Sequence, residues 1–170
     1  RQDDPLFGDT AFILSSAALQ KGGVDGLLAW FDGLPDEQLK QRLFPSVSNR
    51  LESTSWEQRA QWLAAQAAMP YRNDQAYRDF VGGWAEEDPA AALGWVLALP
   101  PSPKDGSTVG LGYAVFPWLE RDAAGFTAHY RSLPPARQQE IVRTIQQITK
   151  DPKFPDRKRL PGLAFLESVK

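Results

Sequence analysis

The fold class is decided by the stretch Trp84-Ala-Glu-Glu-Asp-Pro-Ala-Ala-Ala-Leu-Gly-Trp95, which is closed by Leu99-Pro100. Asp88 can accept hydrogen bonds from the unpaired N–H groups of a first helical turn. Pro89 has the backbone φ angle of that turn, and it lacks the N–H group that would have no partner at this position. A helix should therefore begin at this point. It should end at Leu99, because a residue that precedes proline is pushed out of the α region.

The helix predicted between these signals is apolar over most of its surface. Ala90, Leu93 and Leu97 recur at the i, i+3 and i+7 positions of one helical face, and Trp95 lies beside them. Such a helix is typically packed between neighbours. We therefore expect an inner helix that ends with Leu99 in the core.

The same stretch recurs later in the chain. Of the 18 positions from Trp84 to Pro101, seven are identical to the residue 34 positions further on, where unrelated segments would share about one or two. The identical pairs are Trp84/Trp118, Glu86/Glu120, Asp88/Asp122, Ala90/Ala124, Leu99/Leu133, Pro100/Pro134 and Pro101/Pro135. The chain therefore contains an internal repeat with this spacing.

Earlier copies of the repeat are more divergent. Leu28, Trp30, Leu34 and Pro35 match Leu93, Trp95, Leu99 and Pro100, each pair at the same offset, and a weaker copy ends at Met69-Pro70. Repeat units therefore end near residues 35, 70, 100 and 134, with Leu160-Pro161 as a candidate fifth mark. Period-2 alternation, the mark of strands, is nearly absent.

These signals predict an all-α chain of about ten helices, arranged as antiparallel helical hairpins in an α-solenoid-like or compact irregular array. Residues 1–170 are expected to form one helical-repeat domain, with a C-terminal capping segment at 151–170. Two internal prolines, Pro45 and Pro117, should kink their helices. The expected helices are 10–21, 24–33, 36–52, 55–69, 73–87, 89–99, 105–121, 123–132, 136–150 and 159–169.

The central motif resembles the Trp/Asp-Pro/Ala-Ala/Trp/Leu-Pro helical repeats of uncharacterised bacterial proteins. The resemblance covers about residues 24 to 135, and it implies a tetratricopeptide-like or HEAT-like array without an assigned activity or catalytic residues. The chain departs from the pattern at Gln58, where an aspartate is expected, and at His129, which stands in the slot of Trp95. The standard tetratricopeptide pattern is not met either.

Composition excludes several kinds of chemistry. The chain has no cysteine, which excludes disulfides, thiol catalysis and cysteine-ligated zinc, and its single histidine excludes a histidine-rich metal site. We therefore expect no cofactor and no metal. The densest carboxylate cluster is Glu86, Glu87 and Asp88, which a hydrolase could use as an acid/base pair. Because Asp88 already serves as a helix cap, the cluster is more simply structural.

The six tryptophans offer an alternative function. Trp30, Trp84, Trp95 and Trp118 fall at repeat positions, where packing between helices is the simpler explanation, and Trp56 is the expected exposed exception. A groove lined by tryptophan side chains would suit a peptide or a carbohydrate. A separate glycine-rich stretch, 106–112, lacks the lysine and spacing of a phosphate loop.

Charge is nearly balanced over the chain but unevenly distributed. Lysine and arginine number 19 against 21 acidic residues, which disfavours nucleic acid as a partner. Residues 131–170 nevertheless carry nine basic and four acidic residues, a net charge of +5, which leaves −7 for the rest. The candidate interaction surface comprises Trp56, Lys150, Lys153, Arg157, Lys158 and Arg159.

We predict a noncatalytic protein-binding or scaffolding domain with a protein partner, because helical arrays expose long surfaces and rarely carry chemistry on their repeats. The alternatives are a ligand-binding module with a tryptophan-lined groove and, less favoured, a hydrolase with an acidic site. The sequence predicts a soluble chain, since no apolar run approaches the roughly 20 residues of a membrane span. A start without methionine slightly favours an extracytoplasmic location, and the oligomeric state stays open.

Overall fold

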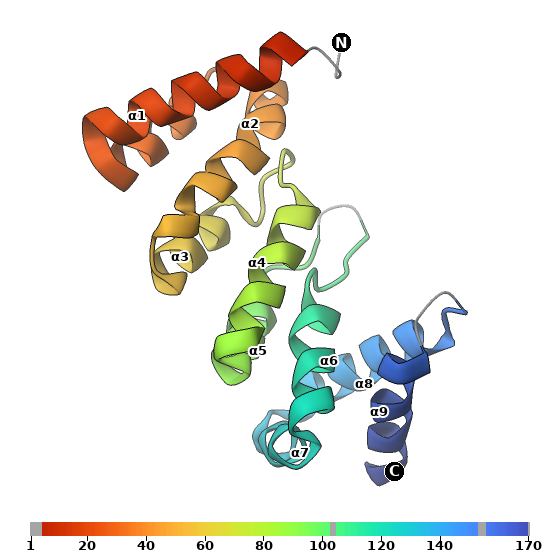
Figure 1. Ribbon diagram of the computed structural model, residues 1–170. Coiled ribbons are helices and arrows are strands. Elements are labelled where there is room, and N and C mark those ends of the chain that lie inside the picture. Colours follow the sequence, from red (N-terminus) through yellow and green to blue (C-terminus); the bar gives the residue numbers. More distant parts are fainter. Residues whose placement is uncertain (1–4, 103–104, 153–155, 170) are drawn as a thin grey trace. The chain divides into compact units, whose positions relative to one another are not determined.

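The structure is a computed structural model that describes residues 5–102, 105–152 and 156–169, with the backbone alone for 5–9, 11 and 156–158. Within these ranges every regular element is helical, as Figure 1 shows. The all-α fold class is therefore confirmed. The elements are α1 (Pro5–Asp32), α2 (Glu37–Arg50), the 3₁₀ turn η1 (Leu51–Ser53), α3 (Trp56–Gln66), α4 (Asp74–Glu87), α5 (Pro89–Ala98), α6 (Leu111–Arg121), α7 (Ala123–Ser132), α8 (Pro135–Lys150) and α9 (Asp156–Ser168).

Helix α1 unites the first two predicted helices. It is interrupted at Gly23, whose φ of 60° and ψ of −155° are not helical. The predicted boundary between 10–21 and 24–33 therefore falls at this break. The alignment that pairs Leu28 with Leu93 also pairs Gly23 with Asp88, so a glycine break stands where the later unit has a capping aspartate.

The start of α6 and the candidate fifth repeat mark differ from prediction. Helix α6 begins at Leu111 instead of 105, because Gly110, with a φ of 90°, is its N-cap. Pro161 lies inside helix α9, so it does not end a repeat unit. Pro45 and Pro117 lie inside α2 and α6, as expected, and each helix continues past its proline.

The described chain forms two compact units, residues 1–76 and 77–170. The single domain expected from the sequence stays a prediction.

The core of the first unit is aromatic. The Phe31 ring lies edge-on to the rings of Phe44, Trp62 and Tyr71, with centroids 5.6 to 6.1 Å apart. The Tyr71 hydroxyl donates to Gln66 Oε1 at 2.6 Å. Burial raises the pKa of Tyr71, and the nearby charges of Asp32 and Glu37 add to the effect. These rings join α1, α2 and α3, which makes the unit's core a product of long-range packing.

Helices α4 to α7 form two successive hairpins, α4–α5 and α6–α7, and the second unit contains all of them except residues 74–76 of α4. Asp88 caps α5 by accepting from the Ala91 N–H at 3.0 Å, and Asp122 caps α7 by accepting from the Gly125 N–H at 2.8 Å. The aromatic pairs correspond as well: Trp84 and Trp95 lie 6.3 Å apart, and Trp118 and His129 lie 5.1 Å apart between ring centroids. One cap and one ring pair of each hairpin therefore recur at the 34-residue offset.

A side chain of one hairpin joins it to the other. Arg121, at the end of α6, donates to the carbonyl oxygens of Ala85 and Glu86 in the last turn of α4. Its guanidinium also lies 3.5 Å from the Glu86 carboxylate. A cation at the C-terminal end of a helix pairs with unsatisfied carbonyls and with the negative end of the helix dipole.

The inner-helix prediction for α5 agrees with the burial of Ala92, Leu93, Val96 and Leu97. The expected core position of Leu99 was wrong, because this C-capping residue is only partly buried. In the same unit α8 and α9 pack on α6, and Phe165 of α9 contacts Phe126 with ring centroids 5.0 Å apart.

Candidate interaction surfaces

Trp56 lies in the first turn of α3 and is half-buried. The Arg59 guanidinium lies over its ring, 5.1 Å from the centroid, and burial lowers the pKa of this arginine. Ser55 caps the helix by accepting from the Gln58 N–H at 3.3 Å. The indole is therefore partly covered by Arg59 and partly exposed at the start of α3.

The predicted basic surface is only partly described. Lys150 is exposed at the end of α8, and Arg159 is half-buried and donates to the Asp151 carbonyl at 2.9 Å. Lys153 lies outside the described residues, and the side chains of Arg157 and Lys158 are likewise outside them. Trp56 belongs to the first unit and these residues to the second, so the grouping of all six into one surface stays a prediction.

The acidic cluster has structural partners. Glu86, Glu87 and Asp88 are all exposed at the junction of α4 and α5. Asp88 is the cap of α5, and the Glu86 carboxylate faces Arg121. None of the three lines a described hollow. The arrangement therefore agrees with the structural role that the sequence favoured.

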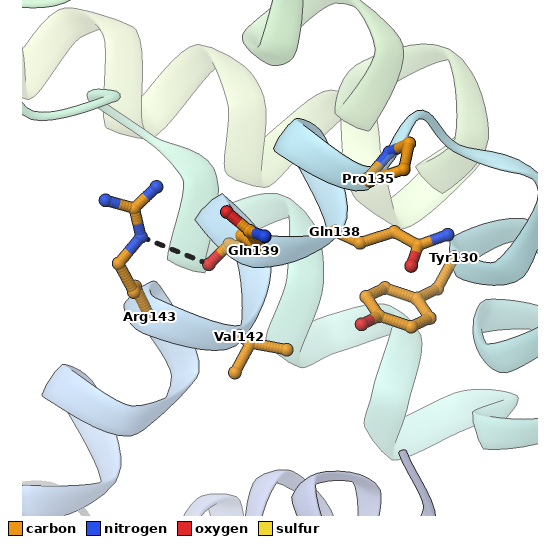
Figure 2. Close-up of a pocket in the computed structure, with 6 residues that line it drawn as sticks. All are labelled: Tyr130, Pro135, Gln138, Gln139, Val142 and Arg143. Atoms are coloured by element: carbon orange, nitrogen blue, oxygen red, sulfur yellow. Dashed lines mark hydrogen bonds between the residues drawn. The ribbon is translucent and has the colours of Figure 1, made fainter. Parts of the chain in front are cut away.

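A shallow hollow of about 410 Å³ lies between α7 and α8 (Figure 2). Tyr130 and Gln138 face each other on one side, and Val142 contributes an apolar surface below them. The Arg143 Nε donates to the Gln139 carbonyl one turn earlier at 3.3 Å, which holds the base of that side chain along α8. Both polar and apolar side chains therefore line the hollow.

A larger hollow of about 580 Å³ lies between the loop before α6 and helix α8. The loop supplies Gly106 and Gly110, both with positive φ, and a Cβ on Gly110 would lie 3.2 Å from Val81. Thr108 donates to Glu140, which is also paired with Arg137 at 2.8 Å. The carboxylate that faces the loop is therefore already occupied.

A third hollow, of about 250 Å³, lies between α1 and α2 in the first unit. The Arg50 guanidinium stacks over the Phe12 ring at 3.8 Å from its centroid, and Ser46 and Asn49 complete the wall. No tryptophan lines this hollow or the two above. The tryptophan-lined groove therefore gains no support from them.

Sequence reasoning missed two exposed apolar helix surfaces. On α1 the side chains of Phe12, Ile13 and Leu14 are 58%, 63% and 47% exposed. On α9 Leu160 and Leu163 are 65% and 41% exposed. Apolar spacing was present in both segments, but periodicity alone does not say whether another helix covers an apolar face.

The described part of the chain holds no group of three or more histidine, cysteine or carboxylate residues placed to bind a metal ion. Within the same ranges no helix is long and apolar enough to cross a membrane. The single histidine, His129, is half-buried against Trp118, and its Nε2 has no hydrogen-bond partner among the described atoms.

Comparison of the chain with family models, curated proteins and solved structures finds no match.

Proposed function

We propose that the chain is a noncatalytic protein-binding or scaffolding module built from helical-hairpin repeats. The observation that supports this proposal is the correspondence of the hairpins α4–α5 and α6–α7, which share caps and ring pairs at a 34-residue offset. Repeats that stack on their neighbours create extended surfaces, and such surfaces bind macromolecules through many modest contacts.

The connection between the hairpins also supports stacking. Arg121 lies at the position equivalent to Glu87 and uses its guanidinium to hold the end of α4. A contact from one repeat to the preceding one is what a continuous helical array requires. We infer on this basis that the chain belongs with the tetratricopeptide-like or HEAT-like arrays.

The candidate surface for a partner includes Trp56 and Lys150. A half-exposed indole held by a cation offers apolar contact area with little loss of side-chain freedom, which is typical of residues that dominate interfaces. Lys150 is exposed and lies in the part of the chain with a net positive charge. An apolar anchor of a partner would suit Trp56, and acidic residues of a partner would separately suit Lys150.

Affinity capture with the immobilised chain tests the proposal. Proteins from the native cell should be retained by the wild-type chain and released by an excess of free wild-type chain. Trp56→Ala or Lys150→Glu should reduce retention, whereas Gln61→Asp, at an exposed position of α3, should not. Native mass spectrometry should find no small molecule bound. Retention of a small ligand without any protein would favour the ligand-binding alternative instead.

A further inference from the structure

The larger hollow, beside the start of α6, is lined by side chains of three helices of the second unit. Arg78 comes from α4, Tyr113 from α6, and Arg143 and Gln147 from α8. Tyr113 and Gln147 are separated by the 34 residues of the repeat offset. Helical-repeat proteins bind partners on extended surfaces to which successive repeats contribute. The hollow is therefore built in the way that such a surface requires.

Two guanidinium groups at this hollow lack a counter-charge. Arg78 is partly buried, and it forms no hydrogen bond or ion pair with any residue that the structure describes. Arg143 is exposed, and within the described ranges its one hydrogen bond runs from Nε to the Gln139 carbonyl. Figure 2 shows its guanidinium directed away from Tyr130 and Gln138, which line the hollow between α7 and α8. Both arginines can therefore donate to a negatively charged partner.

The two carboxylates at the same hollow are already engaged by the chain. Glu140 accepts from Thr108 and from Arg137, the latter at 2.8 Å. Asp105 accepts from the N–H and the hydroxyl of Ser107, at 3.0 and 2.7 Å. Because Arg137 balances the charge of Glu140, the other charged residues described at the hollow are two arginines and one aspartate. The hollow therefore favours an anionic ligand.

Tyr113 adds an apolar surface beside these charges. Its side chain is 48% exposed, and its Cδ1 atom would lie 3.7 Å from a Cβ atom added to Gly82. The ring therefore lies close to α4, the helix that carries Arg78. A tyrosine offers a large contact area with few rotatable bonds, which is typical of residues that anchor interfaces. Arginines beside such a ring suit a segment in which carboxylates surround an apolar residue.

We propose that this hollow binds an acidic segment of a protein partner. Arg78 and Arg143 donate to side-chain carboxylates of the segment, and Tyr113 contacts an apolar residue of the same segment. Guanidinium groups form charge-assisted hydrogen bonds with carboxylates, often two at a time. This inference rests on the proposed function, since it names the chemistry of the partner and a binding surface separate from Trp56.

Titration of the isotope-labelled chain, followed by two-dimensional NMR, tests the proposal. The probe is a blocked peptide of the sequence Glu-Glu-Leu-Glu-Glu, and the control is Gln-Gln-Leu-Gln-Gln, which has a similar shape and no charge. The acidic peptide should shift the amide signals of Gly106, Gly110 and Gly112 until they saturate, because these glycines line the hollow. The neutral peptide should bind at least about threefold more weakly. Added salt should weaken the binding of the acidic peptide alone.

Substitutions assign the binding to the named side chains. Arg78→Gln and Arg143→Gln should each raise the dissociation constant of the acidic peptide by about three- to tenfold, since each removes a charge-assisted hydrogen bond. Tyr113→Ala should weaken the binding of both peptides, whereas Tyr113→Phe should retain it. Arg131→Gln is the matched control, because Arg131 is exposed on α7 and lines neither of the two hollows. Circular dichroism should show that every variant is folded, and the exposed Arg143 provides the test if Arg78→Gln unfolds the chain.

Three results would overturn the proposal: no saturable shift at the three glycines, equal affinity for the two peptides, or unchanged affinity in both arginine variants. Inorganic phosphate that shifts the same signals with equal or higher affinity would indicate a site for free anions, and would overturn it too. If the immobilised chain retains proteins through Trp56 and both arginine variants retain them equally, without peptide binding, this inference fails and the proposed function stands. Peptide binding by a chain that retains no protein would support the hollow as a site and count against the proposed function.

Discussion

The hairpins α4–α5 and α6–α7 have the same backbone plan and different side-chain surroundings. Both begin their second helix at a capping aspartate, and both end it at a leucine followed by proline. Yet α5 buries Ala92, Leu93, Val96 and Leu97, whereas α7 buries only Phe126 and Tyr130. The positions of α7 equivalent to Leu93 and Leu97 are Thr127 and Arg131.

This difference separates features that depend on nearby residues in the sequence from features that depend on the helices packed against each hairpin. Caps and chain reversals work within a few residues, so they persist in both copies. The side-chain face depends on what packs against it. Helix α5 buries the side that carries Leu93 and Leu97, whereas on α7 Thr127 is partly exposed and Arg131 is exposed.

Leu93 and Thr127 occupy the same position in the two hairpins. Leu93→Ala should destabilise the chain by about 2–5 kcal/mol, because it removes a fully buried side chain and leaves a cavity. Thr127→Ala, at the equivalent place in α7, should cost less than about 1 kcal/mol, since Thr127 is only partly buried. Urea unfolding followed by circular dichroism measures both. Equal losses would contradict the different burial of the two helices.

Gly23 interrupts α1 at the position that corresponds to the capping residue Asp88. Gly23→Ala should cost about 1–3 kcal/mol, because φ of 60° with ψ of −155° is a conformation that only glycine adopts readily. Gly22→Ala is the matched control. Its added Cβ meets no atom within 4 Å, and alanine in a helix should stabilise it by up to about 1 kcal/mol. Thermal melts that rank the two variants the other way would show that α1 is continuous.

The caps of α5 and α7 have similar geometry, so they should contribute similarly to the free energy of unfolding. Asp88→Ala and Asp122→Ala should each cost about 0.5–2 kcal/mol, since each leaves a first-turn N–H without its acceptor. The corresponding asparagine variants should retain most of the stability, because asparagine also caps helices. A large loss at one cap with none at the other, in the same urea titration, would refute the equivalence.

The smallest expected effect concerns the connection between the hairpins. Arg121→Ala should lower the free energy of unfolding by about 0.5–1.5 kcal/mol, because two hydrogen bonds to α4 carbonyl oxygens are lost. Since the Arg121 side chain is 44% exposed, water can partly replace these bonds. Arg131→Ala, at an exposed position of α7, should cost less than about 0.5 kcal/mol. Calorimetric melts compare the pair. Indistinguishable melting temperatures would contradict a stabilising contact of Arg121 with the preceding hairpin.

Much of the fold was predictable because its signals are local. Asp88 caps a helix as expected, and the predicted boundary near residue 23 coincides with the break in α1. The start of α6 was missed because Gly110 takes its positive φ where the chain passes close to Val81, a contact made by packing. The spacing of residues in the sequence does not indicate that Gly110 lies close to Val81.

The candidate surfaces were less predictable. Trp56 was expected to be exposed and is half-buried under Arg59, while Leu99 was expected in the core and is partly exposed. The open faces of α1 and α9 were not foreseen, because an apolar spacing looks the same whether or not a neighbour covers it. Exposure is decided by which helices meet, and this depends on tertiary structure.

We propose that α4–α5 and α6–α7 are two copies of one stacking unit. A crystal structure of the chain would test this proposal by superposition of residues 84–101 on 118–135. The Trp84 and Trp95 rings should fall on those of Trp118 and His129, with Arg121 at the carbonyl end of α4. Ring pairs that do not correspond, or an Arg121 side chain directed into solvent, would contradict it.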